Sequence, residues 1–458
     1  AADFAQVPQF ESPWSTLVLV PYLGAFVLYA IGRVSATARD AAALLVAAAT
    51  LWLTLQEPAL DALSRFFALI FVAVAVLVVV YSRGYMKHAE QTNRYTFFVF
   101  LLIGSLLGLA TAGEFGNFYV FWELMTWTSY LLVVHEQTPR ALKAGAVYFV
   151  MCAAGAYVMH FGILLLHAQV GSFEFARIAE GIAQVPPAVG LLAAACLFVG
   201  FAVKAGLWPL HSWLPLAHPA APSSISAPLS GILTKAGLFG IVKVLYLVFG
   251  AGALTRFAAA GFDLPGVLLV LGCATLIYGE VMALLQSEIK RMLAYSTLAQ
   301  IGEIAAILGI GTSLATSAAL LHASNHALMK TALFFAAGAF ILQSGRRQIK
   351  ELAGLGQAMP FSAGCYALAT VAIMGLPPFS GFVSKFLMIT AAADAGRVDV
   401  AALLLAGSVV AAFYYLRIVR VLFFQPYHGS QVKEAPASML IALAVLTDDA
   451  QFMSVQST

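Results

Sequence analysis

The sequence predicts an all-α integral membrane protein with about fourteen transmembrane helices. Hydrophobic residues make up 62% of its 458 residues and charged residues only 10%, whereas soluble domains average about 25% charged residues. The mean hydropathy is +0.91, so the chain lacks the polar residues that a water-soluble surface needs. Apolar runs near the bilayer-spanning length of about 20 residues recur throughout. No nucleic-acid partner is expected.

The predicted spans follow one another with short loops between them. Leu17 to Ile31 is expected to be a first span and not a cleaved signal, because no cleavage site follows it. The last span is the weakest, because the sequence after it, TDDAQFMSVQST, is polar and predicts an incomplete final helix. The spans are 15–32, 41–56, 66–81, 95–112, 117–135, 144–169, 188–208, 223–249, 265–286, 292–310, 313–342, 361–392, 400–416 and 435–446.

Basic residues are distributed unevenly between the two sets of loops. Fifteen lysines and arginines lie in loops after odd-numbered spans and four in loops after even-numbered spans. By the positive-inside rule, the odd-numbered loops face the cytoplasm and the N-terminus faces outward. The sequence therefore predicts a multi-pass protein of a bacterial or archaeal cytoplasmic membrane.

One apolar stretch, Leu197 to Val244, is interrupted in its middle. Its first half carries Lys204 and breaks at Trp208-Pro209, and its second half carries Lys235. Proline removes a backbone donor and ends or kinks a helix. Broken backbone at membrane depth is tolerated only where protein or a water-filled cavity satisfies it. The break, which also contains His211 and His218, therefore indicates a route for ions.

Further ionisable residues lie inside apolar runs. A charged side chain at a helix centre costs about 2.5–3.5 kcal/mol on insertion scales, so several in one chain should face one another or water. Lys243 is expected to reach a membrane interface. Glu280, His160 and His167 are left outside the predicted pathway, since Glu280 lies near the end of its span and the histidines can be core residues. The remaining buried candidates are Glu123, Lys204, Lys235, Glu303, His322, His326, Lys330 and Lys385.

Three of these residues share one helix face. His322, His326 and Lys330 are spaced at i, i+4 and i+8, and histidine changes charge near neutral pH. This stripe favours a proton relay. A zinc pair has no acidic or cysteine partner nearby in sequence, and a haem pair needs histidines on two helices. The competing interpretation is a quinone- or haem-binding membrane subunit of a redox complex. Neither a cofactor nor a metal is expected, and no catalytic residue is assigned.

The break has an echo later in the chain. Gly206-Leu207-Trp208-Pro209 is followed by Gly375-Leu376-Pro377-Pro378, again inside an apolar segment. Matching interruptions in two halves indicate a transporter's binding path. Five spans in each half imply inverted repeats, because an odd number of spans reverses the orientation. The expected segments are 1–94 with three helices, 95–249 and 265–424 with five helices each, and 425–458.

Several ordered blocks resemble one family of membrane proteins. The block PLHSWLPLAHPAAPSSISAPLSGILTKAGLFG is similar to the signature of the antiporter-like subunits of respiratory complex I, Mrp cation/proton antiporters and membrane-bound energy-converting hydrogenases. The blocks FYVFWELMTWTSYLLV, QSEIKRMLAYSTLAQIG, LHASNHALMKTALFFAAG and GLPPFSGFVSKFLM resemble the others in the family's order. The resemblance implies fourteen helices, two inverted five-helix repeats, and broken seventh and twelfth helices.

The resemblance also implies roles for single residues. Glu123 would pair with Lys204, Lys235 would be the lysine of the eighth helix, and Lys385 would be the terminal group of the twelfth. His322, His326 and Lys330 would form the central relay. Glu303 departs from the pattern and is either a partner of a relay lysine or a locally satisfied carboxylate. The chain is expected to carry protons, with Na⁺ left open as a second ion, and to act with other membrane subunits of a quinone reductase, hydrogenase, antiporter or inorganic-carbon uptake complex.

Overall fold

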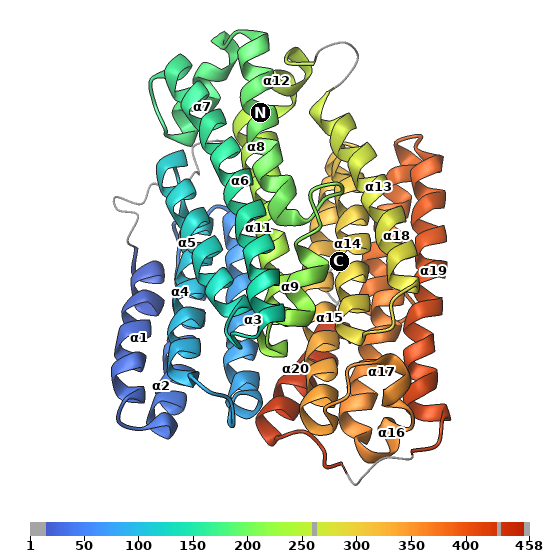
Figure 1. Cartoon of the computed structure of the whole chain (residues 1–458). Helices are drawn as coiled ribbons and strands as arrows, with labels where there is room; N and C mark the ends of the chain where they lie inside the picture. Colours follow the sequence, from blue (N-terminus) through green and yellow to red (C-terminus); the bar gives the residue numbers. More distant parts are fainter. Residues whose placement is uncertain (1–14, 259–262, 428–431, 453–458) are drawn as a thin grey trace. The chain divides into compact units, whose positions relative to one another are not determined.

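The structure, a computed structural model, describes residues 15–258, 263–427 and 432–452, and these are almost entirely helical (Figure 1). The β-structure of these described residues consists of two isolated β-bridges. Nine described helical segments are long and apolar enough to cross a membrane. They are Ala36–Gln56, Ala62–Tyr85, Thr92–Thr111, Pro139–Val170, Pro187–Ala205, Ser223–Arg256, Leu264–Leu284, Ser313–Ser344 and Val398–Phe424.

Each of the fourteen predicted spans falls on helix, but five of them are not among the nine segments that are long and apolar enough to cross a membrane. α1 (Thr16–Gly32), α17 (Pro360–Met374) and α20 (Ala437–Phe452) contribute shorter apolar helices. α5 (Phe115–Val133) and α14 (Ile289–Leu308) are diluted by polar residues, several of which belong to the site below. The predicted span 361–392 consists of two helices, because the chain breaks between Met374 and Ser380.

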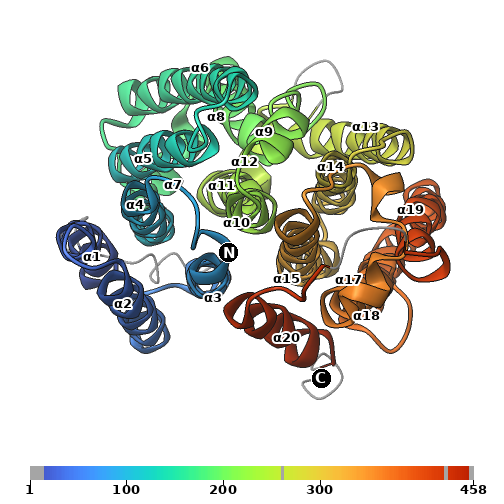
Figure 2. The same cartoon turned by 60° about the horizontal axis from the view of Figure 1, so that its bottom comes forward.

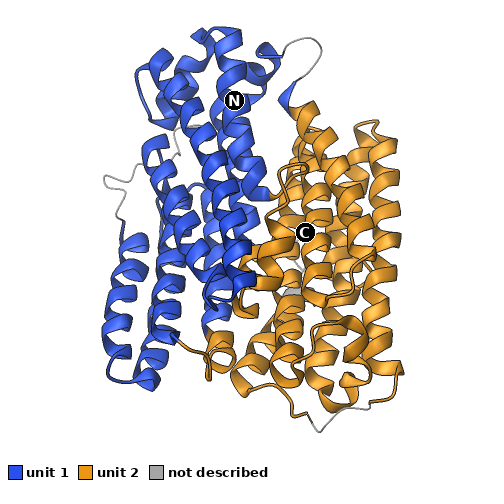
Figure 3. Ribbon diagram, viewed as in Figure 1, with its two compact units in different colours: residues 1–79, 91–205, 232–264 blue, residues 80–90, 206–231, 265–458 orange. Residues whose placement is uncertain are grey.

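The chain divides into two compact units, coloured separately in Figure 3. Unit 1 comprises residues 1–79, 91–205 and 232–264. In it α1 packs on α2 and α4, α5 packs between α4 and α6, and α6 packs on α8 (Figure 2). Its helices are α1, α2 (Ala36–Gln56), most of α3 (Ala62–Tyr85), α4 (Thr92–Thr111), α5, α6 (Pro139–Val170), α7 (Phe175–Gly181), η2 (Ile182–Gln184), α8 (Pro187–Ala205), α11 (Thr234–Gly240), η4 (Ile241–Phe249) and α12 (Gly250–Arg256).

Unit 2 comprises residues 80–90, 206–231 and 265–458 and is organised around one long helix, α15 (Ser313–Ser344). α15 packs on α10, α14, α17, α18 and α20, which explains why most of it is buried. The other elements are α9 (Leu214–Ala220), α10 (Ser223–Pro228), η3 (Leu229–Leu233), whose last two residues fall in unit 1, α13 (Leu264–Leu284), η5 (Ile349–Leu352), α16 (Leu355–Ala358), α18 (Ser380–Asp394) and α19 (Val398–Phe424).

Large apolar side chains lie outside while charged ones lie inside. On α19, Leu405, Val409 and Phe413 are exposed, and on α2 the side chains of Leu45 and Trp52 are exposed. Soluble proteins rarely expose contiguous apolar patches of this kind, whereas lipid satisfies them. All five lysines found inside apolar runs are at most 5% exposed, so the protein interior satisfies their charge.

Both predicted breaks interrupt helix at a glycine. α8 ends at Ala205 and Gly206 has a φ of 81°, while α17 ends at Met374 and Gly375 has a φ of 80°. A φ near 80° is strained for a residue with a Cβ atom and favourable for glycine, which explains why glycine stands at each break. The following X-Pro bonds, Trp208-Pro209 and Pro377-Pro378, are both cis.

Two long helices further upstream of the breaks, α6 and α15, share a set of local features. α6 is N-capped by Thr138 and ends at Gly171 in the left-handed conformation, and α15 is N-capped by Thr312 and ends at Gly345 in the same way. A β-bridge joins Glu114 to Glu174, and another joins Glu288 to Gln348. The same number of positions along the chain separates Thr138 from Thr312, Gly171 from Gly345, Glu114 from Glu288, and Glu174 from Gln348.

Glycine allows α8 and α11 to approach closely within unit 1. A Cβ atom at Gly237 would lie 2.5 Å from the backbone N of Ala205 and 2.7 Å from the backbone O of Phe201. Small residues permit such close helix contacts in membrane proteins. Because Ala205 follows Lys204 and Gly237 lies two residues after Lys235, this contact brings the two lysine-bearing segments together.

We expect Gly237→Ala to destabilise the protein by about 1–3 kcal/mol, because backbone atoms cannot move aside for the added methyl group. The measurement is thermal unfolding of the detergent-solubilised protein. Gly252→Ala is the matched control, since a Cβ at that helical glycine meets no atom within 4 Å and alanine is the better helix former. An equal loss of stability in both variants would contradict the close-contact explanation.

Candidate functional site

Lys204 occupies a buried polar cluster in unit 1. Its Nζ donates to Thr126 Oγ1 at 2.9 Å and to the Tyr148 hydroxyl at 3.2 Å, and that hydroxyl also bonds Ser129 Oγ at 2.6 Å. The lysine is 1% exposed and lies 5.2 Å from the centre of the Tyr148 ring. Neutral hydroxyl groups can solvate both the charged and the uncharged amine, so the cluster can hold or release a proton.

Glu123 lies on α5, one helical turn before Thr126, and is half-buried. Its carboxylate lies between Tyr119 and Trp127, and Oε1 has no hydrogen-bond partner. It is near enough to Lys204 to interact electrostatically. Among the described residues, however, no ion pair of 4.0 Å or less joins the two, so the predicted partners share a cluster without direct contact.

Lys235 lies in α11 and is completely buried. Along the chain, α11 is flanked by two π-helical segments, η3 and η4. Single π-turns in helices occur frequently at functional sites. The Gly237 contact places this lysine-bearing turn against the end of α8, next to Lys204.

The predicted stripe on α15 is fully buried in unit 2. His322 Nδ1 bonds Ser384 Oγ at 2.9 Å and Nε2 bonds Gln300 Oε1 at 3.0 Å. The ring of His326 stacks on His322 with centroids 6.2 Å apart. Lys330 Nζ donates to Ser296 Oγ, to the Tyr415 hydroxyl at 3.0 Å and to Leu293 O at 3.1 Å. The three residues therefore share a helix face but contact different neighbours.

The structure brings Glu303 together with Lys385. Glu303 Oε1 accepts from Lys385 Nζ at 3.0 Å and from Gln300 Nε2 at 3.1 Å, and Lys385 also donates to Ser408 Oγ at 3.1 Å. His322 Nε2 lies 3.7 Å from Glu303 Oε2. The two ion-pair partners are at most 6% exposed. Of the two interpretations left open by the sequence, the geometry favours the partner of a lysine.

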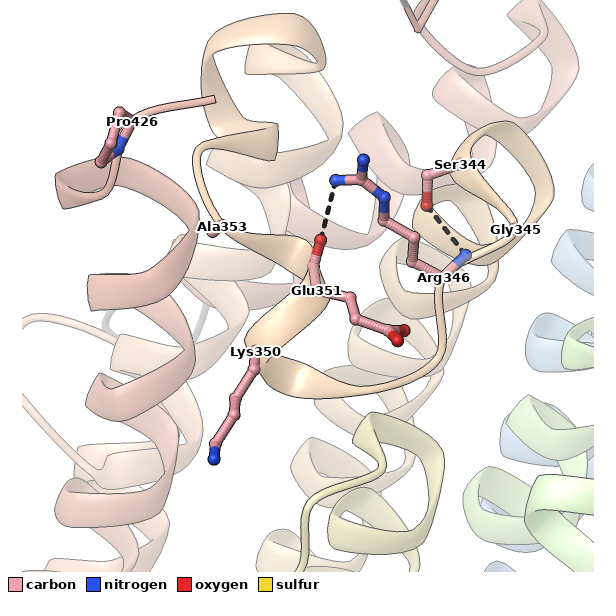
Figure 4. A pocket seen from close by; sticks show the side chains of 7 residues that line it. All are labelled: Ser344, Gly345, Arg346, Lys350, Glu351, Ala353 and Pro426. Atoms are coloured by element: carbon pink, nitrogen blue, oxygen red, sulfur yellow. Dashed lines mark hydrogen bonds between the residues drawn. The ribbon is translucent and has the colours of Figure 1, made fainter. Parts of the chain in front are cut away.

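The two histidines of the first break pack against aromatic rings of unit 2. His211 packs edge-on against Tyr278 with ring centres 4.6 Å apart, and His218 stacks on Phe334 at 4.7 Å. An open surface pocket of unit 2 contains none of the predicted residues. It is lined by Ser344, Gly345, Arg346, Lys350, Glu351, Ala353 and Pro426 (Figure 4).

Lys243 is buried and is not exposed to water; its charged end lies against Asp61, which directly precedes the start of α3. Its Nζ lies 2.5 Å from Asp61 Oδ2 and 2.8 Å from Ser64 Oγ, and the side chain is 3% exposed. Asp61 also accepts from Ser64 N at the start of α3. Burial raises the pKa of Asp61, but the charge of Lys243 and these hydrogen bonds lower it more, so the net pKa is below its usual range. An acidic partner from a distant part of the chain thus satisfies the charge of Lys243 without exposure to water.

Sequence reasoning missed the neutral groups that bind the lysines. Thr126, Tyr148, Ser408 and Tyr415 are individually unremarkable residues, and only the packing of separate helices reveals them. One signal was available on α14, where Ser296, Gln300 and Glu303 recur at i, i+4 and i+7, and so lie on one helix face.

Two family models match the sequence. The model described as "NADH:quinone oxidoreductase/Mrp antiporter, TM" matches residues 112–414. A second, described as "NADH-Ubiquinone oxidoreductase (complex I), chain 5 N-terminus", matches residues 57–96. The first match contains every residue of the clusters around Lys204, Lys330 and Lys385 except Tyr415.

Individual relatives cover most of this chain. It is 32% identical over 420 residues to hydrogenase-4 component B of Escherichia coli (strain K12), covering 84% of this chain and 60% of that protein. The chain therefore spans about three-fifths of the length of that relative.

Two solved structures are similar in fold. A chain of the membrane-bound sulfane sulfur reductase (MBS), an archaeal respiratory membrane complex, matches with a TM-score of 0.87 and 30% identity, covering 95% of this chain and 75% of that chain. A chain of the Mrp complex from Dietzia sp. DQ12-45-1b matches with a TM-score of 0.80 and 25% identity, covering 92% of this chain and 82% of that one.

Proposed function

The chain belongs to the family of antiporter-like membrane subunits shared by NADH:quinone oxidoreductases and Mrp antiporters, and on that premise we propose that it translocates protons as one subunit of a larger membrane complex. The observation that carries the proposal is the burial of Lys204, Lys330 and Lys385 among neutral and acidic hydrogen-bonding groups. Charged residues inside a membrane protein are costly and mark ion pathways.

The proposed groups, in the order that the family resemblance implies, are Glu123, Lys204, Lys235, then His322, His326 and Lys330, and finally Lys385. Glu123 stabilises the charged form of Lys204 when the two approach, and withdrawal of the carboxylate favours release of the proton. Glu303, which forms an ion pair with Lys385 at 3.0 Å, acts on that lysine in the same way. His211 and His218 are not needed in this order.

The proposed architecture is fourteen spans with two inverted five-helix repeats, 95–249 and 265–424, between the segments 1–94 and 425–458. The helix caps, their closing left-handed glycines and the β-bridges recur at one constant separation, and the broken helices recur in the same order at a slightly shorter one; both observations support the repeats. The uneven distribution of basic residues supports an N-terminus on the outer side and odd-numbered loops in the cytoplasm.

The test is proton flux in the complex that co-purifies with this chain. The complex, reconstituted into liposomes with a pH-sensitive dye inside, is compared with a preparation that lacks only this subunit. If the complex also transfers electrons, we expect that reaction to continue in the preparation without this subunit, while fewer protons are moved per turnover. Equal flux in the two preparations would reject the function. Repeating the assay with Na⁺ replaced by K⁺ tests whether sodium is the coupled ion.

A further inference from the structure

Glu280 is a buried carboxyl group that the proposed order of proton transfer does not use. It lies on α13, is 3% exposed, and accepts one long hydrogen bond, from the Tyr414 hydroxyl to Oε1 at 3.4 Å. Its Oε2 has no hydrogen-bond partner. Buried polar groups are costly when they are not hydrogen-bonded. A proton on the carboxyl group or an ordered water is therefore needed to satisfy this oxygen.

Two glycines bring Glu280 close to the helix that carries Glu303. A Cβ atom at Gly279 would lie 2.4 Å from Ala299 N, and one at Gly302 would lie 2.3 Å from Leu276 N. The backbones of α13 and α14 are thus in contact at the residues directly before the two glutamates. The two carboxyl groups are near enough to interact electrostatically.

The titratable groups that face Glu280 come from four helices. Tyr414 of α19 is the direct hydrogen-bond partner. The others interact with Glu280 through their charge and are Glu303 of α14, Lys330 of α15 and Lys385 of α18. The next residue of α19, Tyr415, bonds Lys330. Adjacent tyrosines of one helix therefore reach Glu280 and the lysine of the central relay.

Glu280 lies on the side of the Glu303–Lys385 pair that faces the end of α13. A Cβ atom at Gly407 of α19 would lie 3.1 Å from Leu276 Cδ1 and 3.8 Å from Glu303 Oε1. Because Leu276 belongs to α13, the Glu303 carboxylate lies at the level of Leu276 along that helix. Glu280 lies one turn further along α13, and the helix ends one turn later at Leu284. There Arg417 donates to Leu284 O at 3.2 Å and to Gln286 O at 2.7 Å.

We propose that Glu280 is the proton-uptake group of the second half of the chain, receiving protons from water at the end of α13 and passing them by way of bound water to the Glu303–Lys385 pair. This inference rests on the proposed function and, for the side of uptake, on the proposed orientation, in which α13 ends at the cytoplasm. The step moves one proton and no electrons. An O–H bond of a hydronium ion at the end of α13 breaks and leaves water, and an O–H bond to the Glu280 carboxylate forms. That bond then breaks in turn, which restores the carboxylate, as the proton passes through bound water to the Glu303–Lys385 pair.

The test uses Glu280→Gln in the complete reconstituted complex. Glutamine keeps the size and polarity of the side chain but cannot carry a proton. Because a positioned proton-transfer group contributes about 10²–10⁴-fold to rate, we expect proton flux to fall at least tenfold. Glu280→Asp should keep a measurable flux with a changed pH dependence. The matched control is Glu351→Gln, which alters an exposed glutamate of the same unit and should leave the flux unchanged.

An infrared pH titration gives a second readout that a purely structural role would not affect. Glu280→Gln should remove one carboxylic-acid band that titrates in the wild-type complex. If the Glu280→Gln complex shows wild-type flux while the separate Lys204→Ala complex is inactive, the inference is overturned and the proposed function stays intact. Wild-type flux in both variants would reject the function itself. If Glu280→Gln fails to assemble, an unchanged pH dependence in Glu280→Asp overturns the inference and a shifted one supports it.

Discussion

Replacing Lys204 by alanine is expected to abolish proton translocation while the subunit still inserts and assembles. Lys204 Nζ is the proposed proton-carrying group of its cluster, in which it donates to the hydroxyl groups of Thr126 and Tyr148 and also interacts with the Cys152 thiol. Hydroxyl groups of these types do not titrate near neutral pH. The hydroxyl groups left behind cost about 1–3 kcal/mol each at most, and they retain bonds to Ser129 and to the helix backbone.

A companion variant separates loss of charge from loss of a titrating group. Lys204→Arg keeps the positive charge, but arginine is not deprotonated in proteins. We expect it to be as inactive as Lys204→Ala in the liposome flux assay, whereas Lys143→Ala, at an exposed lysine of unit 1, should translocate protons normally. Each 100 mV of membrane potential corresponds to about 2.3 kcal/mol per charge, so the assay should be run with the potential clamped. Retained pumping in Lys204→Ala would remove the mechanism.

The sequence predicted which residues are buried better than it predicted what they touch. Apolar runs and prolines locate helices and breaks because both are local properties of the chain. Lys204 and Lys385 could be identified because a charge within an apolar run requires an explanation. Their partners could not, since Thr126 and Ser408 resemble many other hydroxyl residues until separate helices pack together.

Lys243 and Glu303 show the same limit in opposite ways. The snorkelling prediction for Lys243 assumed water as its only partner, and Asp61, a residue far away in sequence, provides a closer one. Glu303 had two interpretations of equal local support, and the packing of α14 and α18 favours the one with Lys385. In each case a long-range ion pair decided the outcome, and helical periodicity contains no information about it.

The Glu303–Lys385 pair should give the largest effect on stability. Lys385→Met leaves the Glu303 carboxylate buried without its cation, and Glu303→Gln leaves the Lys385 ammonium without its anion. Removing one partner of a buried ion pair costs about 3–5 kcal/mol. We expect each single variant to unfold at a markedly lower temperature than the wild type, as measured on the detergent-solubilised complex.

The double variant Glu303→Gln/Lys385→Met distinguishes a structural pair from a functional one. Neither remaining side chain carries a charge, so its stability should recover most of what each single variant loses, because exchange of a whole buried pair for neutral residues is often nearly neutral. Proton flux should not recover, since Lys385 is the proposed terminal group. Recovery of flux together with stability would mean that the pair only holds α14 and α18 together. Stability without flux is the result expected if the charges are retained, despite their cost, because protons move through them.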